Sequence, residues 1–458
     1  MIQKKIIELA NMIHVHNDLS AYAEQNIKGV SINSLSIEKG NLFVPLKGGK
    51  RDGHEFVEQA IKQGASASLW QKDVPTPPTD LPILIVDDTL EALQQLAKSY
   101  RDELSLKVVG ITGSNGKTTT KDMLAEVLSS KYKVQKTSGN FNNHIGLPLT
   151  ILDLKKETEI AVLEMGMSDF GEIDLLTKIA RPDAAIITNI GDAHLQELGS
   201  REGIAKAKLE IVNGLKEGGL FVYPGDELLI KERLEGTAQP WNIRTFGKQE
   251  TNDLYPRTLE ANAEGSTFTI NQSDLTFTLP ILGEYNVMNA LAVMLVAKEW
   301  GISFSMMNEA FSKIKLSHMR LEKTFGINGS HILNDAYNAS PTSMKAVVDL
   351  VANLPGYKKK IVVLGDMLEL GPNEDQFHKE VGMHINPEKI HYVYTYGELA
   401  KSIAEGARSK FTESNVFSFT EKKALIEHLK QQLDHDTIVL VKGSRGMRLE
   451  EVVEKIKQ

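Results

Sequence analysis

Hydrophobic runs and amphipathic stretches alternate along most of the chain. From about residue 86, the apolar runs LKVVGIT, IAVLEM and AAIITNI are separated by helical patterns such as those at 118–131 and 171–180. Alternation of this kind is typical of a parallel sheet with helices packed on its faces. The pattern therefore predicts an α/β fold for this part of the chain.

A different periodicity follows the predicted parallel sheet. The stretch GSTFTINQSDLTFTLP, residues 265–280, alternates polar and apolar residues with period two. That period predicts a β-hairpin, and a helix is expected after it at about 286–300.

The last third of the chain has the most regular pattern. HILNDAY, KKIVVLGDM, KIHYVYTYG and TIVLVKGS are predicted strands, each followed by a helix, and Ser340 and Pro341 supply a helix cap and a first-turn proline. This pattern predicts a Rossmann-like α/β unit. It lacks the G-x-G-x-x-G fingerprint, so a dinucleotide site is not predicted.

The first 85 residues predict a small α/β unit. A short amphipathic helix is expected at the start, NLFVPL and ASASLW are predicted strands, and EFVEQAIKQG is a predicted helix that ends at Gly64. The proline-rich stretch VPTPPTDLP is interpreted as an extended connector. We therefore predict three α/β domains, at 1–85, 86–318 and 319–458: a small N-terminal domain, a central parallel-sheet domain with a β-hairpin region, and a C-terminal Rossmann-like domain.

Composition excludes several classes of function. The 458 residues include no cysteine, which rules out disulfides, thiolate metal sites and a cysteine nucleophile. With 52 Lys and Arg against 60 Asp and Glu, the net charge is -8, which disfavours a nucleic-acid partner. The sequence shows no signal peptide and no apolar run of about 18 residues, so we predict a cytoplasmic protein without membrane contact.

The strongest chemical signal is a glycine-rich loop between a predicted strand and a predicted helix. It runs through Thr112, Gly113, Ser114, Asn115, Gly116, Lys117, Thr118 and Thr119. Glycines let successive backbone N–H groups point at phosphate oxygens. The lysine is expected to reach the β- and γ-phosphates and the Thr118 hydroxyl to bind Mg²⁺, so the loop predicts a nucleoside triphosphate site. The central domain is thus predicted to be a P-loop domain, and the loop alone does not specify the reaction.

Three further residues are candidates for metal binding. Glu164 ends the run IAVLE, where a carboxylate is placed to bind Mg²⁺, or else is simply exposed at a strand end. His194 lies in the loop after AAIITNI, where a histidine is either a ligand or merely exposed. Lys208 shares the core stripe of its predicted helix with Ile204, so it is either buried with a lowered pKa or reaches solvent from the helix edge. A buried neutral amine can react with CO₂ to form an anionic carbamate.

Together these residues resemble those of the Mur ligases, ATP-dependent amide-forming enzymes of bacterial peptidoglycan synthesis, and the resemblance covers essentially the whole chain. It implies that Lys117, Glu164, His194 and a carbamylated Lys208 form the catalytic and metal-binding set for two Mg²⁺ ions. It also implies that Asn289 contacts the nucleotide base and that Arg320 and Asp335 contact ATP when the third domain closes.

Within the family, DGHEFVEQAIKQGA, TSGNFNNHIGLP and NDAYNASPTSM with VVLGDMLELG resemble the branch that joins D-alanyl-D-alanine to UDP-N-acetylmuramoyl-tripeptide. The D-N-P-R motif of the sister enzyme that adds the third amino acid is absent. The resemblance implies substrate contacts at Asn33, Ser34, Asn142, Asn143, Asn338 and Ser340. Asn33 and Leu35 stand where the family often has an acid and an arginine, so backbone or neighbouring groups are expected to hold the uridine nucleotide.

The implied reaction has two steps. The tripeptide carboxylate attacks the γ-phosphate of ATP to give an acyl phosphate, which the amine of the dipeptide then attacks. A monomer is expected, and the base that takes the amine proton, like the choice of lysine or diaminopimelate in the tripeptide, is left open. The alternatives are a folylpolyglutamate synthase-like ligase, a protein that uses ATP as a switch, and a catalytically silent relative. The leading segment and NFNNHIG favour a uridine-linked substrate over the first, and Lys117, Glu164, His194 and Lys208 argue against the last.

Overall fold

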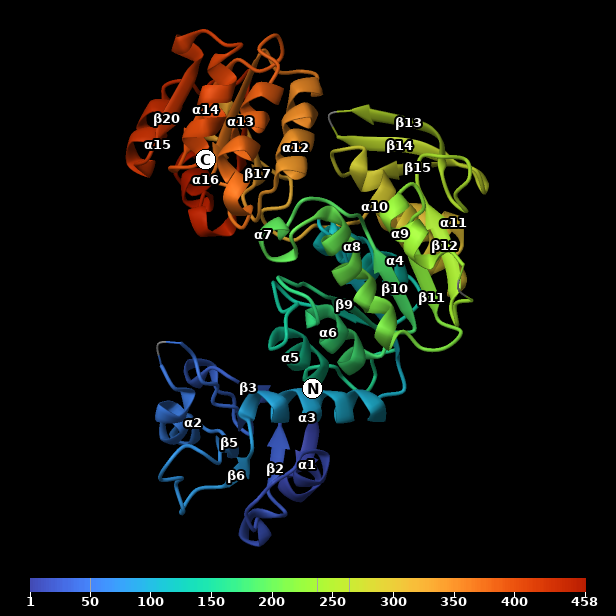
Figure 1. Ribbon diagram of the computed structural model, residues 1–458, viewed down its shortest axis with the longest axis vertical. Helices are drawn as coiled ribbons and strands as arrows, with labels where there is room; N and C mark the ends of the chain where they lie inside the picture. The colour runs from blue at the N-terminus through green and yellow to red at the C-terminus, as the bar shows by residue number, and fades with distance from the viewer. Residues whose placement is uncertain (50, 237, 263) are drawn as a thin grey trace.

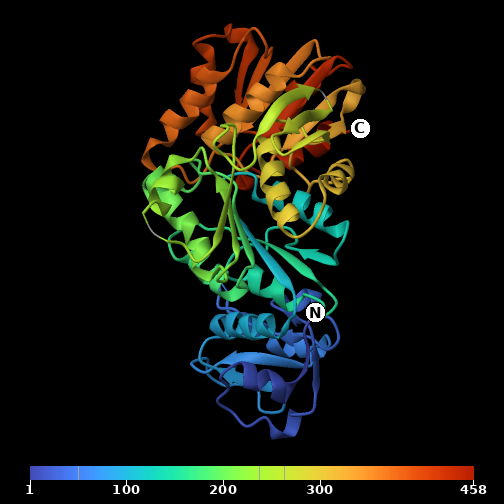
Figure 2. The same ribbon diagram turned by 90° about the vertical axis from the view of Figure 1, so that its right-hand side faces the viewer.

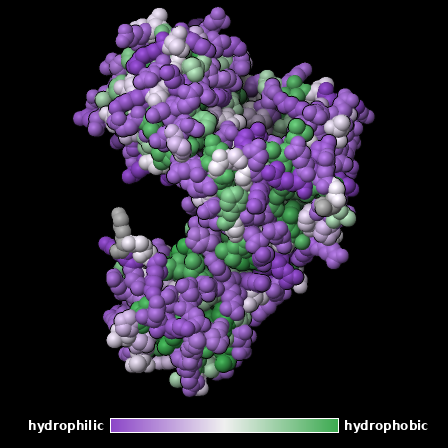
Figure 3. All heavy atoms as spheres, viewed as in Figure 1, coloured by the Kyte–Doolittle hydropathy of each residue, from purple (hydrophilic) through white to green (hydrophobic). Residues whose placement is uncertain are grey.

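Three α/β regions follow one another in space in the same order as in the sequence. The computed structural model describes residues 1–49, 51–236, 238–262 and 264–458. In Figure 1 the N-terminal region lies at the bottom, the central region at the right and the C-terminal region at the top. The three regions form a C, and Figure 3 shows the hollow that opens on one side between the N-terminal and C-terminal regions.

The N-terminal region is built on a parallel four-stranded sheet of order β3-β4-β5-β6, with a separate antiparallel pair of β1 and β2. Its elements are β1 (Gln3–Lys5), α1 (Ile6–Met12), β2 (Asn26–Lys28), β3 (Val30–Ser31), β4 (Leu42–Phe43), α2 (Val57–Lys62), β5 (Ala67–Gln71) and β6 (Ile83–Val86). The expected helix at the start is thus preceded by a short strand. Gly64 ends the α2 segment at φ +117°, as the sequence predicts.

The proline-rich stretch does not connect two domains, and that interpretation is wrong. It is a loop between β5 and β6, which pair in parallel from Ser68 with Ile83 to Gln71 with Val86. The predicted limit at residue 85 therefore falls inside β6. The actual passage to the central region is made by α3 (Thr89–Glu103), which packs against helices of both regions and runs between them in Figures 1 and 2.

The central region contains an all-parallel six-stranded sheet of order β12-β11-β10-β7-β9-β8. Val108 of β7 faces one core and Val109 the other, so helices cover both faces as predicted. Its elements are β7 (Lys107–Thr112), α4 (Lys117–Ser129), β8 (Val134–Lys136), α5 (Gly146–Leu152), β9 (Ile160–Glu164), α6 (Glu172–Ala180), β10 (Ala184–Ile187), α7 (Leu195–Leu198), α8 (Arg201–Leu209), β11 (Leu220–Pro224), α9 (Leu228–Leu234) and β12 (Asn242–Phe246).

An antiparallel sheet of order β13-β14-β15 completes the central region. The predicted hairpin is present as β14 (Gly265–Ile270) and β15 (Ser273–Leu279), and β13 (Pro256–Asn262) adds a strand that was not predicted. The helix α10 (Tyr285–Glu299) follows as predicted, and then α11 (Phe304–Phe311). The middle of α10 is buried almost all round, which explains why it shows no amphipathic stripe.

The C-terminal region has a six-stranded sheet of order β16-β17-β21-β18-β19-β20, parallel except for β16. All four predicted strands are present, and β16 and β20 are additions at the two edges. Its elements are β16 (Glu322–Phe325), β17 (His331–Asp335), α12 (Pro341–Asn353), β18 (Lys359–Gly365), α13 (Glu374–His384), β19 (Tyr392–Tyr396), α14 (Ala400–Arg408), β20 (Val416–Phe419), α15 (Lys422–Lys430), β21 (Thr437–Lys442) and α16 (Glu450–Ile456). No helix in the described part of the chain has the length and apolar character needed to cross a bilayer.

Candidate active site

The glycine-rich loop connects β7, in the middle of the central sheet, to the start of α4. Two of its glycines have backbone angles that favour glycine, with φ +151° at Gly113 and +81° at Gly116. A Cβ on Gly113 would lie 1.8 Å from Thr188 Oγ1, and one on Gly116 would lie 2.8 Å from Asn289 Oδ1. Conformation and space therefore both require glycine here, and the loop packs closely against the residues behind it.

Residues at the end of the neighbouring strand β10 hold the loop in place. Asn189 accepts hydrogen bonds from the backbone N–H groups of Ser114 (3.1 Å, through its carbonyl) and Asn115 (3.0 Å, through Oδ1). Thr188 Oγ1 donates to the Asn115 carbonyl at 2.5 Å. Neither residue was predicted to support the loop, although both lie at the end of the predicted strand AAIITNI. A loop braced in this way is already shaped before any phosphate arrives.

Lys117 is folded back onto its own loop. Its Nζ donates a hydrogen bond to the Gly113 carbonyl at 2.7 Å. Burial lowers the pKa of Lys117, the nearby charge of Arg320 lowers it further, and that of Glu164 raises it. A phosphate oxygen would offer this ammonium a charged acceptor in place of a neutral carbonyl.

Glu164 ends β9, the other strand beside β7, and only 3% of the residue is exposed. Its Oε1 accepts a hydrogen bond from Asn142 Nδ2 at 2.9 Å. Its Oε2 is buried with no hydrogen-bond partner in the described chain, and the nearest ammonium, that of Lys121, is 4.0 Å away. A buried carboxylate oxygen without a partner fits a cation ligand, and the exposed alternative is wrong.

Lys208 is buried, as its place on the core stripe predicts, and 1% of the residue is exposed. Its helix α8 ends at Leu209, and a 3₁₀ segment, Glu210–Gly214, follows it. No described residue accepts a hydrogen bond from this ammonium or pairs with it. Burial, and secondarily the charge of Lys117, lower the pKa of Lys208 well below 10.5. The chain thus keeps an unpaired amine in the interior near Lys117, where its neutral form is favoured.

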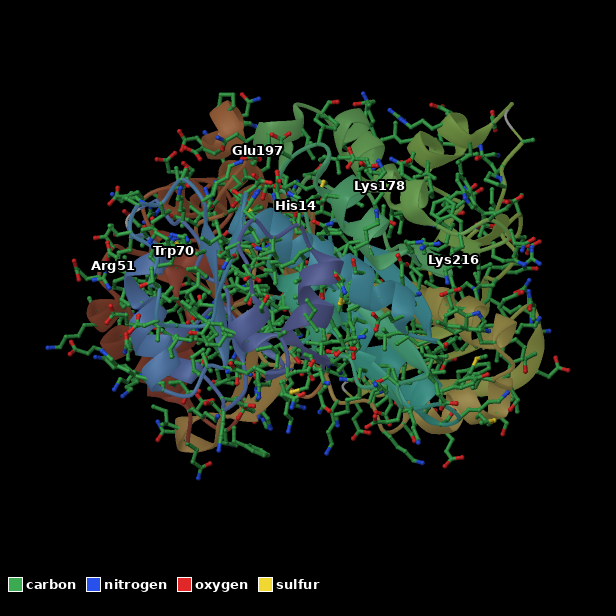
Figure 4. All side chains as sticks on the ribbon, turned by 90° about the horizontal axis from the view of Figure 1, so that it is seen from below. His14, Arg51, Trp70, Lys178, Glu197 and Lys216 are labelled. Atoms are coloured by element: carbon green, nitrogen blue, oxygen red, sulfur yellow. The ribbon has the colours of Figure 1, made fainter. Side chains whose placement is uncertain are left out.

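His194 directly precedes α7, at the contact with the C-terminal region. Its backbone is left-handed at φ 64°, and its Nδ1 is 3.0 Å from Glu369 Oε2 without hydrogen-bond geometry. Among the described residues, the one group of three His, Asp or Glu side chains with mutually close ligand atoms is His14, His16 and Asp87. Those three are exposed in the N-terminal region, the end nearest the viewer in Figure 4. A metal near the phosphate loop would therefore also depend on hydroxyl, carbamate or phosphate oxygens.

A cavity of about 280 Å³ separates the phosphate loop from the C-terminal region. Residues 114–119 and Asn289 line one side, and Arg320, Asp335 and Asn338 line the other. The Arg320 guanidinium donates to Thr118 Oγ1 at 3.3 Å and stacks on the Tyr337 ring, 4.0 Å from its centre. The structure thus brings the predicted nucleotide residues from both regions around one cavity.

A buried ion pair fixes the C-terminal wall of this cavity. Lys442 Nζ lies 2.5 Å from Asp335 Oδ2 and also donates to the Asn338 carbonyl at 2.9 Å. Lys442 was not predicted, but it ends β21, which pairs with β17 and brings Lys442 opposite Asp335. One carboxylate oxygen of Asp335 is therefore already engaged by the protein.

The predicted substrate residues are divided between two places. Asn33 lines a second cavity of about 620 Å³ between the N-terminal and central regions, whereas Ser34 is buried. Asn33 Oδ1 also accepts from the Leu35 backbone N–H at 3.0 Å. Asn143 Oδ1 accepts from the backbone N–H of Gly146, the first residue of α5, at 2.8 Å.

Ser340 also has a local structural role. It is buried at the start of α12, where its backbone N–H donates to Ser343 Oγ at 2.9 Å. Ser343, rather than Ser340, lines the nucleotide cavity next to Asn338.

Comparison with known proteins covers the whole chain. Residues 26–101, 111–297 and 319–445 match the Mur ligase family catalytic domain, the Mur ligase middle domain and the Mur ligase glutamate ligase domain, respectively. The chain is 50% identical over 456 residues to the UDP-N-acetylmuramoyl-tripeptide–D-alanyl-D-alanine ligase of Bacillus subtilis strain 168, covering 100% of this chain and 99% of the relative.

Two solved structures are similar throughout. A crystal structure of MurF from Acinetobacter baumannii superposes with a TM-score of 0.88 at 29% identity, covering 99% of this chain and 98% of that one. MurF from Thermotoga maritima in complex with ADP gives 0.82 at 31% identity, covering 93% and 96%.

Proposed function

The chain belongs to the Mur ligase family, and on that premise we propose that it joins D-alanyl-D-alanine to UDP-N-acetylmuramoyl-tripeptide at the expense of ATP. The products are UDP-N-acetylmuramoyl-pentapeptide, ADP and phosphate, which places the reaction in peptidoglycan precursor synthesis. The full-length identity to a ligase of that name supports the substrates. The observation that carries the chemistry is the cavity shared by the phosphate loop and Arg320.

In the first step the tripeptide carboxylate attacks the γ-phosphorus of ATP, the bond to the bridging oxygen breaks, and ADP leaves. Two anions must approach each other, so the protein's task is to offset their repulsion. Backbone N–H groups of residues 116–119, at the start of α4, would hold the phosphates, since those of Ser114 and Asn115 already donate to Asn189. Lys117 Nζ would release the Gly113 carbonyl and donate its hydrogen bond to phosphate oxygens instead. Arg320 would contact the phosphates from the C-terminal side of the cavity.

Two Mg²⁺ ions fit this proposal on the chain's own chemistry. Thr118 and the unpartnered Oε2 of Glu164 would hold one, and His194 with a carbamylated Lys208 would hold the other. Bound there, the ions would supply positive charge to the transferring phosphoryl group. The burial and missing partner of Lys208 support the carbamate, since only a neutral amine reacts with CO₂.

In the second step the dipeptide amine attacks the acyl carbon and phosphate leaves. Phosphorylation makes this possible because hydroxide is a poor leaving group. We place the dipeptide on the C-terminal side of the cavity, near Asn338 and Ser343, with Ser340 behind them at the start of α12. Asp335 is an unsuitable base for the amine proton, since Lys442 and the Leu321 N–H already occupy its two oxygens.

Each of the three regions would bind a different substrate. We assign the N-terminal region to the uridine nucleotide, the central region to ATP, and the C-terminal region to the dipeptide and to closure over ATP. The cavity that includes Asn33 supports the first assignment, with the muramoyl group directed toward Asn142 and Glu164. We further propose that the enzyme acts as a cytoplasmic monomer on these small molecules, without nucleic acid or membrane.

Mass spectrometry of a reaction mixture tests the proposal directly. The protein is incubated with ATP, Mg²⁺, UDP-N-acetylmuramoyl-tripeptide and D-alanyl-D-alanine. We expect a product heavier than the tripeptide substrate by the dipeptide minus one water, together with ADP and phosphate. Reactions without the dipeptide, or with L-alanyl-L-alanine, serve as controls for amine specificity.

The same assay separates the alternatives. ATP hydrolysis without an amide product would favour a nucleotide switch and contradict the proposal. A parallel reaction supplies a folate and glutamate in place of the tripeptide and the dipeptide; glutamate addition there, without amide formation in the first mixture, would favour the folylpolyglutamate synthase-like hypothesis.

A further inference from the structure

Asp122 lies on α4, five residues beyond Lys117, and is almost completely buried. Its Oδ1 accepts a hydrogen bond from Lys136 Nζ at 2.6 Å. Its Oδ2 accepts two hydrogen bonds from Ser317, one from the backbone N–H at 2.9 Å and one from Oγ at 2.7 Å. One carboxylate thus joins the phosphate-loop helix to a segment 195 residues further along the chain.

The same carboxylate is linked to Glu164 through Lys121. The buried Lys121 ammonium lies 3.6 Å from Asp122 Oδ1 and 4.0 Å from Glu164 Oε2. Burial opposes the ionisation of Asp122, but the charges of Lys121 and Lys136 and the hydrogen bonds hold its pKa below the usual range. Asp122 is therefore a carboxylate that balances Lys121 beside the phosphate loop.

Ser317 belongs to the linker between α11 and β16, which carries the chain into the C-terminal region. Met319 and Leu321 of this linker have left-handed backbones, at φ 60° and 52°. Such angles are unfavourable for residues with a Cβ and persist only where surrounding contacts hold them. At the far end of the linker, the Leu321 N–H donates to Asp335 Oδ1 at 3.2 Å.

The linker is therefore anchored at both ends, to the central region at Ser317 and to the C-terminal region at Leu321. Arg320 lies between the two anchors and reaches Thr118. A shift at Ser317 would move Arg320 relative to the phosphate loop, since only two residues separate them.

We propose that Asp122 is a positioning residue for the ligase reaction. By holding Ser317, it fixes the linker to the C-terminal region so that Arg320 faces Thr118. This role rests on the proposed function, because its catalytic importance is the placing of Arg320 over ATP. It is distinct from nucleotide binding itself, since Asp122 and Ser317 are not part of the phosphate loop.

Hydrogen exchange on the full chain tests the structural part without any turnover. In the wild type, the Ser317 amide is protected by Asp122. In Asp122→Asn, amides of the 312–321 segment should exchange at least about ten-fold faster, the ratio expected from losing a hydrogen bond to a charged acceptor. Ser317→Ala keeps the backbone bond and should give a smaller increase. Wild-type exchange in both variants would overturn the proposal.

Kinetics test the functional part. Ser317→Ala should lower kcat roughly ten-fold with little change in KM for ATP, because the loop that binds ATP is untouched. Ser317→Thr, which keeps the hydroxyl, should restore turnover. Ser312→Ala is the matched control, as that exposed serine bonds only within its own helix end. In the Asp122→Asn background, Ser317→Ala should add little further loss, whereas additive losses would show that the two residues act separately and contradict the proposal.

Failure of the proposed function would look different. If the wild type forms no amide, the assigned reaction is wrong. Hydrogen exchange of segment 312–321 then decides by itself whether Asp122 anchors the linker. If the wild type is active and Ser317→Ala turns over normally, the reaction stands and the positioning role is overturned.

Discussion

Replacing Lys208 with methionine should make the protein more stable and inactive. Methionine has nearly the same length and no charge, so it fills the same space in the core. Lys208 is 1% exposed and has no partner in the described chain, so folding must either bury its charge or remove its proton, and methionine avoids both costs. Lys206, exposed on the same helix, provides the matched control, Lys206→Met.

The size of the gain follows from the burial. Replacing a buried ion pair by apolar groups of similar volume is often neutral or stabilising by about 1–4 kcal/mol, and Lys208 has no partner charge to offset its desolvation. For a cooperative unit of 150–250 residues, each kcal/mol raises Tm by about 2–4 °C. We therefore expect Lys208→Met to raise the Tm of the central region by at least about 2 °C at neutral pH, with Lys206→Met nearly unchanged.

The gain should depend on pH with a defined sign. Burial lowers the folded-state pKa of Lys208 below its ordinary 10.5. As pH falls from 10.5, Lys208 is therefore protonated in the unfolded chain before it is protonated in the folded protein. Between the two pKa values, the wild type gains about 1.4 kcal/mol of stability per pH unit as pH rises. The advantage of Lys208→Met should therefore be greatest below the folded-state pKa and disappear near pH 10.5.

Thermal melts in CO₂-free buffers between pH 6 and 10.5 measure this dependence, and amide formation is assayed in parallel. Lys208→Ala should also be inactive, and short carboxylic acids should partly restore it by supplying the missing carboxylate. A Lys208→Met protein that is less stable than the wild type at every pH would refute the unpaired-charge argument. A well-folded Lys208→Ala that no acid rescues would refute the carbamate.

Three other outcomes are expected. Lys117→Ala should lose at least about 100-fold in kcat/KM, measured by ADP release, and near-normal turnover would contradict its role at the γ-phosphate. Asp335→Ala should destabilise the C-terminal region by about 3–5 kcal/mol in a urea titration, because it leaves the buried Lys442 ammonium without a charged partner. Adding Lys442→Met to this variant should recover part of the loss. Equal stability of the wild type, Asp335→Ala and the double variant would disprove the pairing. Small-angle scattering with ATP analogue and tripeptide should show a smaller radius of gyration than the free enzyme, and an unchanged radius would count against domain closure.

Much of the central and C-terminal fold follows from the sequence because parallel strands are buried on both faces. They appear as short apolar runs, and the helices between them carry a polar face, so both are recognisable. The edge strands β16 and β20 were missed because one side of each is partly exposed. Two-residue strands such as β3 and β4 are defined by their partners rather than by their own pattern.

The phosphate loop could be predicted because its chemistry depends on backbone geometry that only glycine permits. The residues that support it were harder to recognise. Asn189, Lys121 and Lys442 are ordinary polar residues in the sequence, and their roles arise from strand order and from contacts between regions. The connector interpretation of the prolines failed for a related reason: a loop between two paired strands has the same composition as a linker between domains.

The two cavities occur at two successive contacts of one chain, the first between the N-terminal and central regions and the second between the central and C-terminal regions. A single molecule with one end in each cavity would cross-link all three regions at once. Its second end would bind at the high effective concentration set by its spacer, so two weak fragments could give tight binding. A spacer too short to reach both cavities would lose this advantage completely. The affinity of such compounds as a function of spacer length would therefore measure the distance between the two cavities in solution.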